Sequence, residues 1–190
     1  MSSRKILGVI RNDNSPMSWI ITVILAFVVV KFLLFPGLGF LLSTSHPVVA
    51  VVSNSMHHGG NLDQWWDQQG GWYERNGINK SNAEQWPLKN GFDKGDIIIL
   101  KGSPSYQNGD TIVFIGKSKN PIIHRVVKVT QEGNRYIYQT KGDNNPDSHE
   151  SIGELSIPQE KVIGKSIIKI PYLGWLKLLA SEGLNLTKGG

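Results

Sequence analysis

The chain has 190 residues, a formal net charge of +5 and no cysteine, and 39% of its residues are hydrophobic. This length is enough for one domain with a core of its own. Without cysteine there can be no disulfide bond and no thiolate metal site, so packing must hold the fold together. The basic residues are scattered singly between Lys89 and Lys188, unlike the basic runs of nucleic-acid-binding tails, and nucleic acid is therefore not an expected partner.

An apolar segment near the N-terminus predicts a membrane anchor. From Trp19 to Leu42 the only charged residue is Lys31. A helix of this length is about 36 Å long and crosses a hydrocarbon core of roughly 30 Å with some tilt. The tail that precedes it carries more basic than acidic residues, and the positive-inside rule therefore predicts a cytoplasmic N-terminus with the rest of the chain outside.

The end of this helix is less clearly marked, because a proline and two glycines interrupt its last third. The helix is therefore expected over Met17 to Phe35. A lysine in mid-span costs about 2.5–3.5 kcal/mol, but a helix that ends near Phe35 lets the Lys31 ammonium reach the outer surface. The alternative is a cleavable signal peptide with a small-residue site at Val48-Val49-Ala50, which the long apolar run disfavours.

Beyond Thr44, short β-branched runs alternate with turn residues, as in an all-β domain. Two runs open alike, Lys94-Gly95-Asp96 and Asn108-Gly109-Asp110, and predict the same turn into a buried strand. The expected strands are Val48–Ser53, Asp96–Leu100, Thr111–Ile115, Ile122–Thr130, Tyr136–Thr140 and Lys161–Ile170.

The expected organisation is a cytoplasmic tail (1–16), a transmembrane anchor (17–43), an outer β domain (44–180) and a C-terminal tail (181–190). Residues 57–93 differ in composition and are expected to be an insertion. Four of the six tryptophans lie there, without a sustained apolar period. A locally packed loop is the simplest expectation, and the tryptophans could form a small core of their own, contact lipid or belong to a substrate lid.

Two residues of the outer domain could perform acyl transfer together. A serine hydroxyl is a weak nucleophile and needs a base, and Ser55 follows the anchor closely while His124 lies in an alternating strand. Each has a simpler explanation, because serines at strand ends form turns and strand histidines are often buried and hydrogen-bonded. The carboxylate-rich turn at 140–147 could orient the imidazole.

Four segments taken in order resemble a known family. Ser-Asn-Ser-Met at 53–56, Gly-Asp-Ile-Ile at 95–98, His-Arg-Val at 124–126 and Lys-Gly-Asp-Asn-Asn at 141–145 follow an N-terminal anchor. This order is similar to that of the archaeal and endoplasmic-reticulum type I signal peptidases, the Ser-His branch of that family. The likeness extends to about Trp175, apart from the insertion, and implies a mainly β, signal-peptidase-like domain on one N-terminal transmembrane helix.

The resemblance implies roles for individual residues. Ser55 would be the nucleophile, His124 its base, and Ser53 a donor to the oxyanion together with the backbone amide of Ser55. Asp143 matches the first acidic position of the family and would orient His124 or shape the site. Met56 would help to line the substrate cleft.

The sequence departs from the family at two points. His57-His58-Gly59 replaces the proline expected soon after Met56. His149 stands where the second aspartate is expected, so Asp147 is the candidate for that role and Glu150 a possible substitute.

The implied function is that of a membrane-bound serine endopeptidase that removes signal peptides from exported preproteins without a cofactor. Its expected partners are preproteins and membrane lipid, with accessory subunits left open. The expected location is the cell membrane, or the endoplasmic reticulum membrane in a eukaryote.

Three other functions are compatible with parts of the sequence. A zinc hydrolase could use His57, His58, His124 and His149, although no His-Glu-x-x-His element is present. A binding module without catalytic activity could use the Trp-rich insertion as its contact surface. A self-cleaving peptidase of the repressor type resembles the fold but uses a lysine base.

Overall fold

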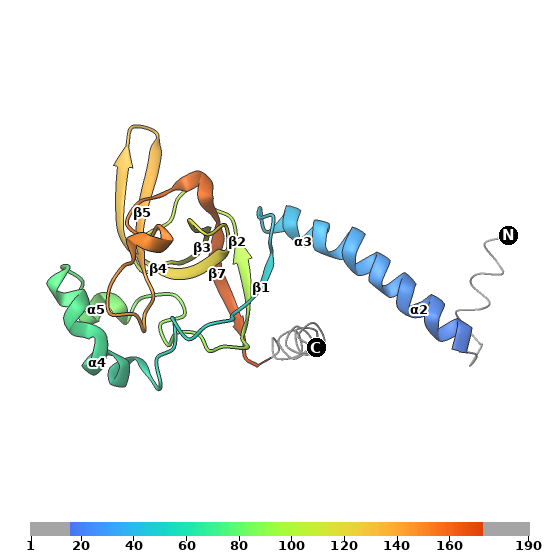
Figure 1. Cartoon of the computed structure of the whole chain (residues 1–190), viewed down its shortest axis with the longest axis horizontal. Coiled ribbons are helices and arrows are strands. Elements are labelled where there is room, and N and C mark those ends of the chain that lie inside the picture. The colour runs from blue at the N-terminus through green and yellow to red at the C-terminus, as the bar shows by residue number, and fades with distance from the viewer. Residues whose placement is uncertain (1–15, 173–190) are drawn as a thin grey trace, which may run out of the picture. The chain divides into compact units, whose positions relative to one another are not determined.

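The computed structural model describes residues 16–172 and divides the chain into two compact units, residues 1–41 and 42–190. From residue 16 onward the first unit is a helical rod, and the second is a β domain (Figure 1). The expected features of residues 1–15 and 173–190 lie outside the described residues.

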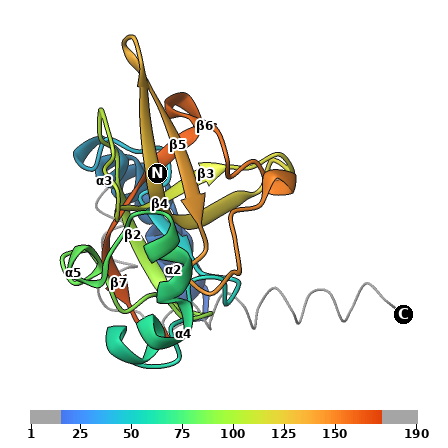
Figure 2. The same ribbon diagram turned by 90° about the vertical axis from the view of Figure 1, so that its left-hand side faces the viewer.

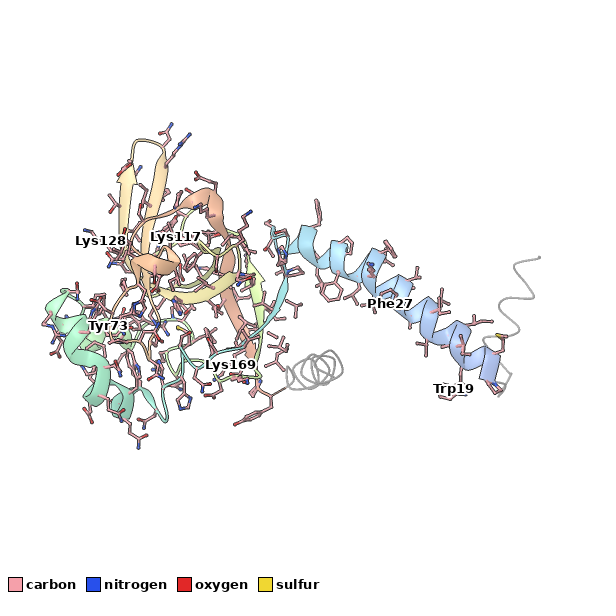
Figure 3. All side chains as sticks on the ribbon, viewed as in Figure 1. Trp19, Phe27, Tyr73, Lys117, Lys128 and Lys169 are labelled. Atoms are coloured by element: carbon pink, nitrogen blue, oxygen red, sulfur yellow. The ribbon has the colours of Figure 1, made fainter. Side chains whose placement is uncertain are left out.

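The helical unit is long and apolar enough to cross a membrane over Pro16–Leu41. It consists of α2 (Pro16–Val29), the π-helical η1 (Val30–Leu34) and α3 (Phe35–Leu41). Side chains such as Trp19 and Phe27 point outward from the rod (Figure 3). The expected end at Phe35 is wrong, because the helix continues to Leu41. A π-turn, in which the Phe35 N–H donates to the Val30 carbonyl, comes just before Pro36, and such a turn accommodates the missing proline donor.

Lys31 consequently lies within the helix, about 15 Å from its end at Leu41. Its ammonium nitrogen lies 5.6 Å from the Phe27 ring centroid and 5.5 Å from that of Phe32. These cation–π contacts place the charge against ring faces on the same helix.

Up to Tyr172, the β domain contains one seven-stranded antiparallel sheet in the order β1-β2-β7-β3-β4-β5-β6, which confirms the mainly β prediction. β3 has the expected bounds, most others differ by a few residues, and β1 ends three residues early. The two-residue β6 was not predicted. The strands are β1 (Val48–Ala50), β2 (Ile97–Lys101), β3 (Thr111–Ile115), β4 (Pro121–Glu132), β5 (Arg135–Lys141), β6 (Ile157–Pro158) and β7 (Val162–Ile170).

The two similar turns have the same local structure, as predicted. Gly95 and Gly109 have φ angles of +95° and +92°, which glycine adopts readily. The aspartate that follows each glycine accepts a hydrogen bond from the backbone N–H three residues earlier, at 2.9 Å for Asp96 and 3.0 Å for Asp110. Each aspartate also faces a lysine of β7.

The insertion is helical, so the expected loop is wrong. α4 (Leu62–Arg75) begins at a capping box in which Asn61 and Gln64 exchange hydrogen bonds, and α5 (Lys80–Ala83) follows it. Both views place α4 at the end of the β domain opposite to the tip of the β4–β5 hairpin (Figures 1 and 2). Its buried side chains form an aromatic core of their own, which contacts Val127 of β4. The members are Leu62, Trp65, Trp66, Tyr73, Ile78, Ala83, Trp86 and Val127.

Candidate active site

A pocket of about 130 Å³ contains the two serines and the histidine singled out above. Ser53, Ser55 and His124 all line its wall. The rest of the lining is mostly aliphatic, from β1, β3 and β4 and the residues beside them. These further residues are Val49, Ala50, Val52, Val113, Pro121, Ile122 and Ile123. The sheet therefore brings together residues that are far apart in the sequence.

Ser55 follows β1 in a turn, where its side chain is only partly buried. Its Oγ lies 3.1 Å from the Oγ of Ser53, so the two hydroxyls share a hydrogen bond. Its carbonyl accepts a 2.8 Å hydrogen bond from the Asn144 N–H, which ties the serine to the turn after β5. Within the described chain, no hydrogen bond joins Ser55 Oγ to His124. In free enzymes the contact between nucleophile and base is often longer than in the substrate complex.

His124 is buried in β4, where it pairs with Ile112 of β3. Its Nδ1 lies 2.5 Å from Oε1 of Glu154, whose side chain is fully buried. When a carboxylate accepts the Nδ1 proton, Nε2 is left without one and can act as the base. This tautomer follows from the hydrogen-bond partners.

Glu154 is held by several contacts besides the one to His124. Its Oε1 accepts a 3.2 Å hydrogen bond from Thr140 Oγ1, and its Oε2 accepts a 2.8 Å one from the His149 N–H. The preceding Gly153 has a φ of +89°, which allows the chain to turn after the short 3₁₀ helix η2 (Glu150–Ile152). The Glu154 carboxylate is thus held by His124, by Thr140 and by the His149 backbone.

Asp143, the expected partner of His124, binds Arg125 instead. Nε and Nη2 of Arg125 lie 2.9 and 2.6 Å from the two carboxylate oxygens. His58 and Tyr73 also hydrogen-bond to this carboxylate, which is fully buried. Burial alone would raise its pKa, but the charge of Arg125 and the hydrogen bonds of His58 and Arg125 together hold the pKa well below its usual range.

The other predicted residues also lie apart from His124. Asp147 accepts a 2.9 Å hydrogen bond from the Trp72 indole at the surface, and Glu150 is exposed at the start of η2. Met56 is fully buried in the core beside Phe92 and does not line the pocket. Its sulfur instead accepts the Asp143 N–H at 3.4 Å.

The acidic partner of His124, Glu154, lies further along the sequence than the carboxylates that the resemblance implied. All of the candidates lay between residues 143 and 150, whereas the chain returns to His124 only after the turn at Gly153. The one local signal was Gly-Glu after a short polar turn, a combination that is common at protein surfaces.

The histidines considered as zinc ligands do not form a cluster within the described residues. His57 pairs with Asp93, His58 with Asp143 and His124 with Glu154, so three of the four rings lie against three different carboxylates. Across residues 16–172, no group of three or more histidine, aspartate or glutamate side chains is placed to hold a metal ion.

Comparison with curated proteins finds a consistent set of relatives. The signal peptidase complex catalytic subunit SEC11 of Colletotrichum graminicola is 33% identical over 98 residues, which cover 48% of this chain and 57% of that protein. The protein of the same name from Komagataella phaffii is 28% identical over 162 residues, 80% of this chain and 76% of its own length. Both relatives are named as catalytic subunits of a signal peptidase complex.

The resemblance drawn from the four sequence segments is thereby confirmed. No family model matches the sequence. The chain spans 57% of the length of the first relatives that it matches, among them SEC11 of Metarhizium robertsii at 33% identity over 48% of this chain. The longer match to the Komagataella SEC11 extends the likeness to most of both proteins.

Proposed function

We propose that this chain is a membrane-anchored serine endopeptidase that cleaves signal peptides from preproteins, with Ser55 as nucleophile, His124 as base and Glu154 as the group that orients the base. One observation carries the proposal. His124 faces the pocket that also contains Ser55 and Ser53, and a buried carboxylate binds its other ring nitrogen. Nucleophile, base and orienting acid are the parts that acyl transfer requires.

In the proposed reaction, Nε2 of His124 takes the hydroxyl proton of Ser55 while Oγ attacks the scissile carbonyl carbon. The oxygen of the tetrahedral intermediate accepts hydrogen bonds from the Ser53 hydroxyl and the Ser55 N–H. His124 then donates the proton to the leaving amine, and the C–N bond breaks. Water activated by the same imidazole releases the acyl group.

The pocket also supports a substrate class. Its volume of about 130 Å³ and its aliphatic lining from β1 and β3 suit small apolar side chains next to the cleaved bond. Val49 and Ala50 lie in β1, which among residues 16–172 is an edge strand paired with β2 alone, so an extended substrate can align beside the site.

The helix Pro16–Leu41 supports a membrane location. We place the N-terminus in the cytoplasm and the β domain on the outer or lumenal side, in the endoplasmic reticulum if the source is eukaryotic. The relatives are named as catalytic subunits of a complex, and accessory subunits are therefore proposed for this chain too. Confining enzyme and preprotein to one membrane raises their effective concentration.

The test is processing of a preprotein by the full chain in lipid vesicles. Ser55→Ala and His124→Ala should each abolish processing while the variants insert and fold like the wild type, and a metal chelator should have no effect. Normal processing by either variant refutes the role proposed for that residue. A folded wild-type chain that cuts no preprotein but binds one through the insertion would support the binding-module alternative.

A further inference from the structure

The insertion makes direct contact with the turn that joins the two halves of the proposed active site. This turn, residues 142–144, follows β5. It lies against both Ser55 and His124, although it contains neither the nucleophile nor the base.

The turn touches both proposed catalytic residues at short range. A Cβ at Gly142 would lie 2.9 Å from Nε2 of His124, so the glycine backbone lies directly against the ring. The Asn144 N–H donates to the Ser55 carbonyl at 2.8 Å, and its side-chain amide donates to the Asn54 carbonyl at 3.2 Å. A movement of this turn would therefore move the nucleophile and the base relative to each other.

Residues of the insertion bind the middle residue of the turn, Asp143. Tyr73 Oη donates to its Oδ1 at 3.1 Å, and His58 Nε2 lies 2.8 Å from its Oδ2. The Trp65 indole N–H donates to its carbonyl at 3.1 Å. All of these contacts are buried, where hydrogen bonds are not weakened by competing water.

The spacing on α4 explains how one helix can make these contacts. Trp65 and Tyr73 are eight residues apart and lie on the same helix face. The side chain of Tyr73 points from α4 into the domain (Figure 3). His58 stacks on the Trp65 ring, with 4.2 Å between centroids and 6° between planes. The three side chains thus form one packed unit beneath the turn.

A cation–π layer adds to this packing. The Lys141 ammonium lies 4.8 Å from the Tyr73 ring centroid and donates to the Gly142 carbonyl at 3.1 Å. The Arg125 guanidinium lies 4.6 Å from the Trp86 ring centroid. Aromatic rings of the insertion therefore pack on two cations that both hydrogen-bond to Asp143.

We infer that the insertion is a positioning element of the active site, in which Trp65, Tyr73 and His58 fix the 142–144 turn and thereby set the geometry of Ser55 and His124. This inference rests on the proposed function. A peptidase site has to be held to within about 0.5 Å, and a misplacement of about 1 Å can cost 10²-fold in rate. A lid would bind substrate from outside, whereas these contacts are fully buried within the domain.

The deciding variant is Tyr73→Phe. It removes the hydroxyl that donates a hydrogen bond to Asp143 and keeps the ring in the aromatic core. The expected result is a fall of about 10-fold or more in kcat for a preprotein, with KM within about twofold. The Nδ1 proton resonance of His124 should also shift in the full chain in micelles. The chain has five histidines, and His124→Ala identifies that resonance by its loss. Trp65→Phe should have the same two effects.

The matched control is Trp66→Phe, on the same helix. Trp66 is also buried in the aromatic core, but its indole makes no hydrogen bond in the part of the chain that the structure describes. Trp66→Phe should lower the unfolding midpoint about as much as Trp65→Phe does. Its kcat per folded molecule and its His124 resonance should both keep their wild-type values. If Trp65→Phe fails to fold, Tyr73→Phe alone decides.

The inference requires that Tyr73→Phe both lowers kcat and shifts the His124 proton resonance. If either quantity keeps its wild-type value, the inference is overturned. Failure of the proposed function is a separate result, because Ser55→Ala would then process preprotein normally. In that case the His124 resonance still decides whether the insertion holds the turn.

Discussion

Nδ1 of His124 lies 2.5 Å from Oε1 of Glu154, and both side chains are buried. A charge-assisted hydrogen bond of this length fixes the imidazole ring in one orientation. In the proposed reaction, this contact would also stabilise the imidazolium formed when His124 accepts the Ser55 proton. Glu154 should therefore matter to the rate of the reaction more than to substrate binding.

The first prediction is that Glu154→Gln lowers kcat by about 10²–10⁴-fold with little change in KM, because an amide can reverse the preferred tautomer of His124. The measurement is steady-state cleavage of a preprotein by the purified chain. Glu150→Gln makes the same chemical change at an exposed position four residues earlier and should leave kcat unchanged. Equal rates for the two variants would remove Glu154 from the mechanism.

The second prediction concerns Gly142, where a side chain would meet Nδ2 of Asn145 at 2.6 Å and Nε2 of His124 at 2.9 Å. Gly142→Ala should displace the ring or the turn and lower kcat by about 10-fold or more. Gly133→Ala is the control, because a Cβ at Gly133 meets no atom within 4 Å, although its φ of +61° costs some stability. Full activity in Gly142→Ala would show that the turn tolerates displacement.

The third prediction concerns the stabilising role of Asp143. Asp143→Asn leaves the buried Arg125 guanidinium without its counter-charge and should destabilise the domain by about 3–5 kcal/mol at pH 7, measured by urea unfolding. The folded-state pKa of Asp143 lies well below its usual range, so its contribution is fully present above the unfolded pKa of about 4 and is lost as pH falls below it. The difference in unfolding free energy between the wild type and Asp143→Asn should therefore become smaller below pH 4. A constant difference from pH 7 to pH 3 would contradict this account.

The fourth prediction concerns Lys141, a buried lysine whose pKa is lowered to about 8 by burial, against the attraction of Asp143, Glu154 and Asp147. The unfolded chain keeps this proton up to about pH 10.5, so it binds more protons than the folded chain between pH 8 and 10.5. Stability due to this group must therefore rise with pH across that interval. Between pH 8 and pH 10.5, the unfolding free energy of the wild type minus that of Lys141→Met should increase by about 1–3 kcal/mol. A flat difference would mean that Lys141 keeps an ordinary pKa.

The sequence predicted the strands better than the insertion, and composition explains why. Runs such as Ile97–Ile99 and Ile112–Val113 are β-branched and follow Gly-Asp turns, so local propensity and tertiary burial favour the same structure. α4 contains Gly70-Gly71 and several tryptophans, which argue against a helix locally. Its helix depends on packing: a Cβ at Gly70 would lie 2.6 Å from the Trp66 ring, so the absent side chain makes room for that ring.

The candidate site was predicted in part for a similar reason. Ser53, Ser55 and His124 lie in short segments with recognisable neighbours, and the sheet register brings them to one pocket. The carboxylates could not be assigned from spacing. Whether Asp143 or Glu154 faces His124 depends on how the chain turns at Gly142 and Gly153, and on the insertion that binds Asp143.

The absence of cysteine from this chain allows a direct test of the claim that His124 activates Ser55. Ser55→Cys introduces a single thiol, and its pKa can be measured from the rate of alkylation as a function of pH in the 190-residue chain. If His124 serves this residue, the thiol pKa should lie clearly below the ordinary value of about 8.5 and return toward it in Ser55→Cys combined with His124→Ala. An ordinary pKa in Ser55→Cys that His124→Ala leaves unchanged would contradict the proposed pair of nucleophile and base.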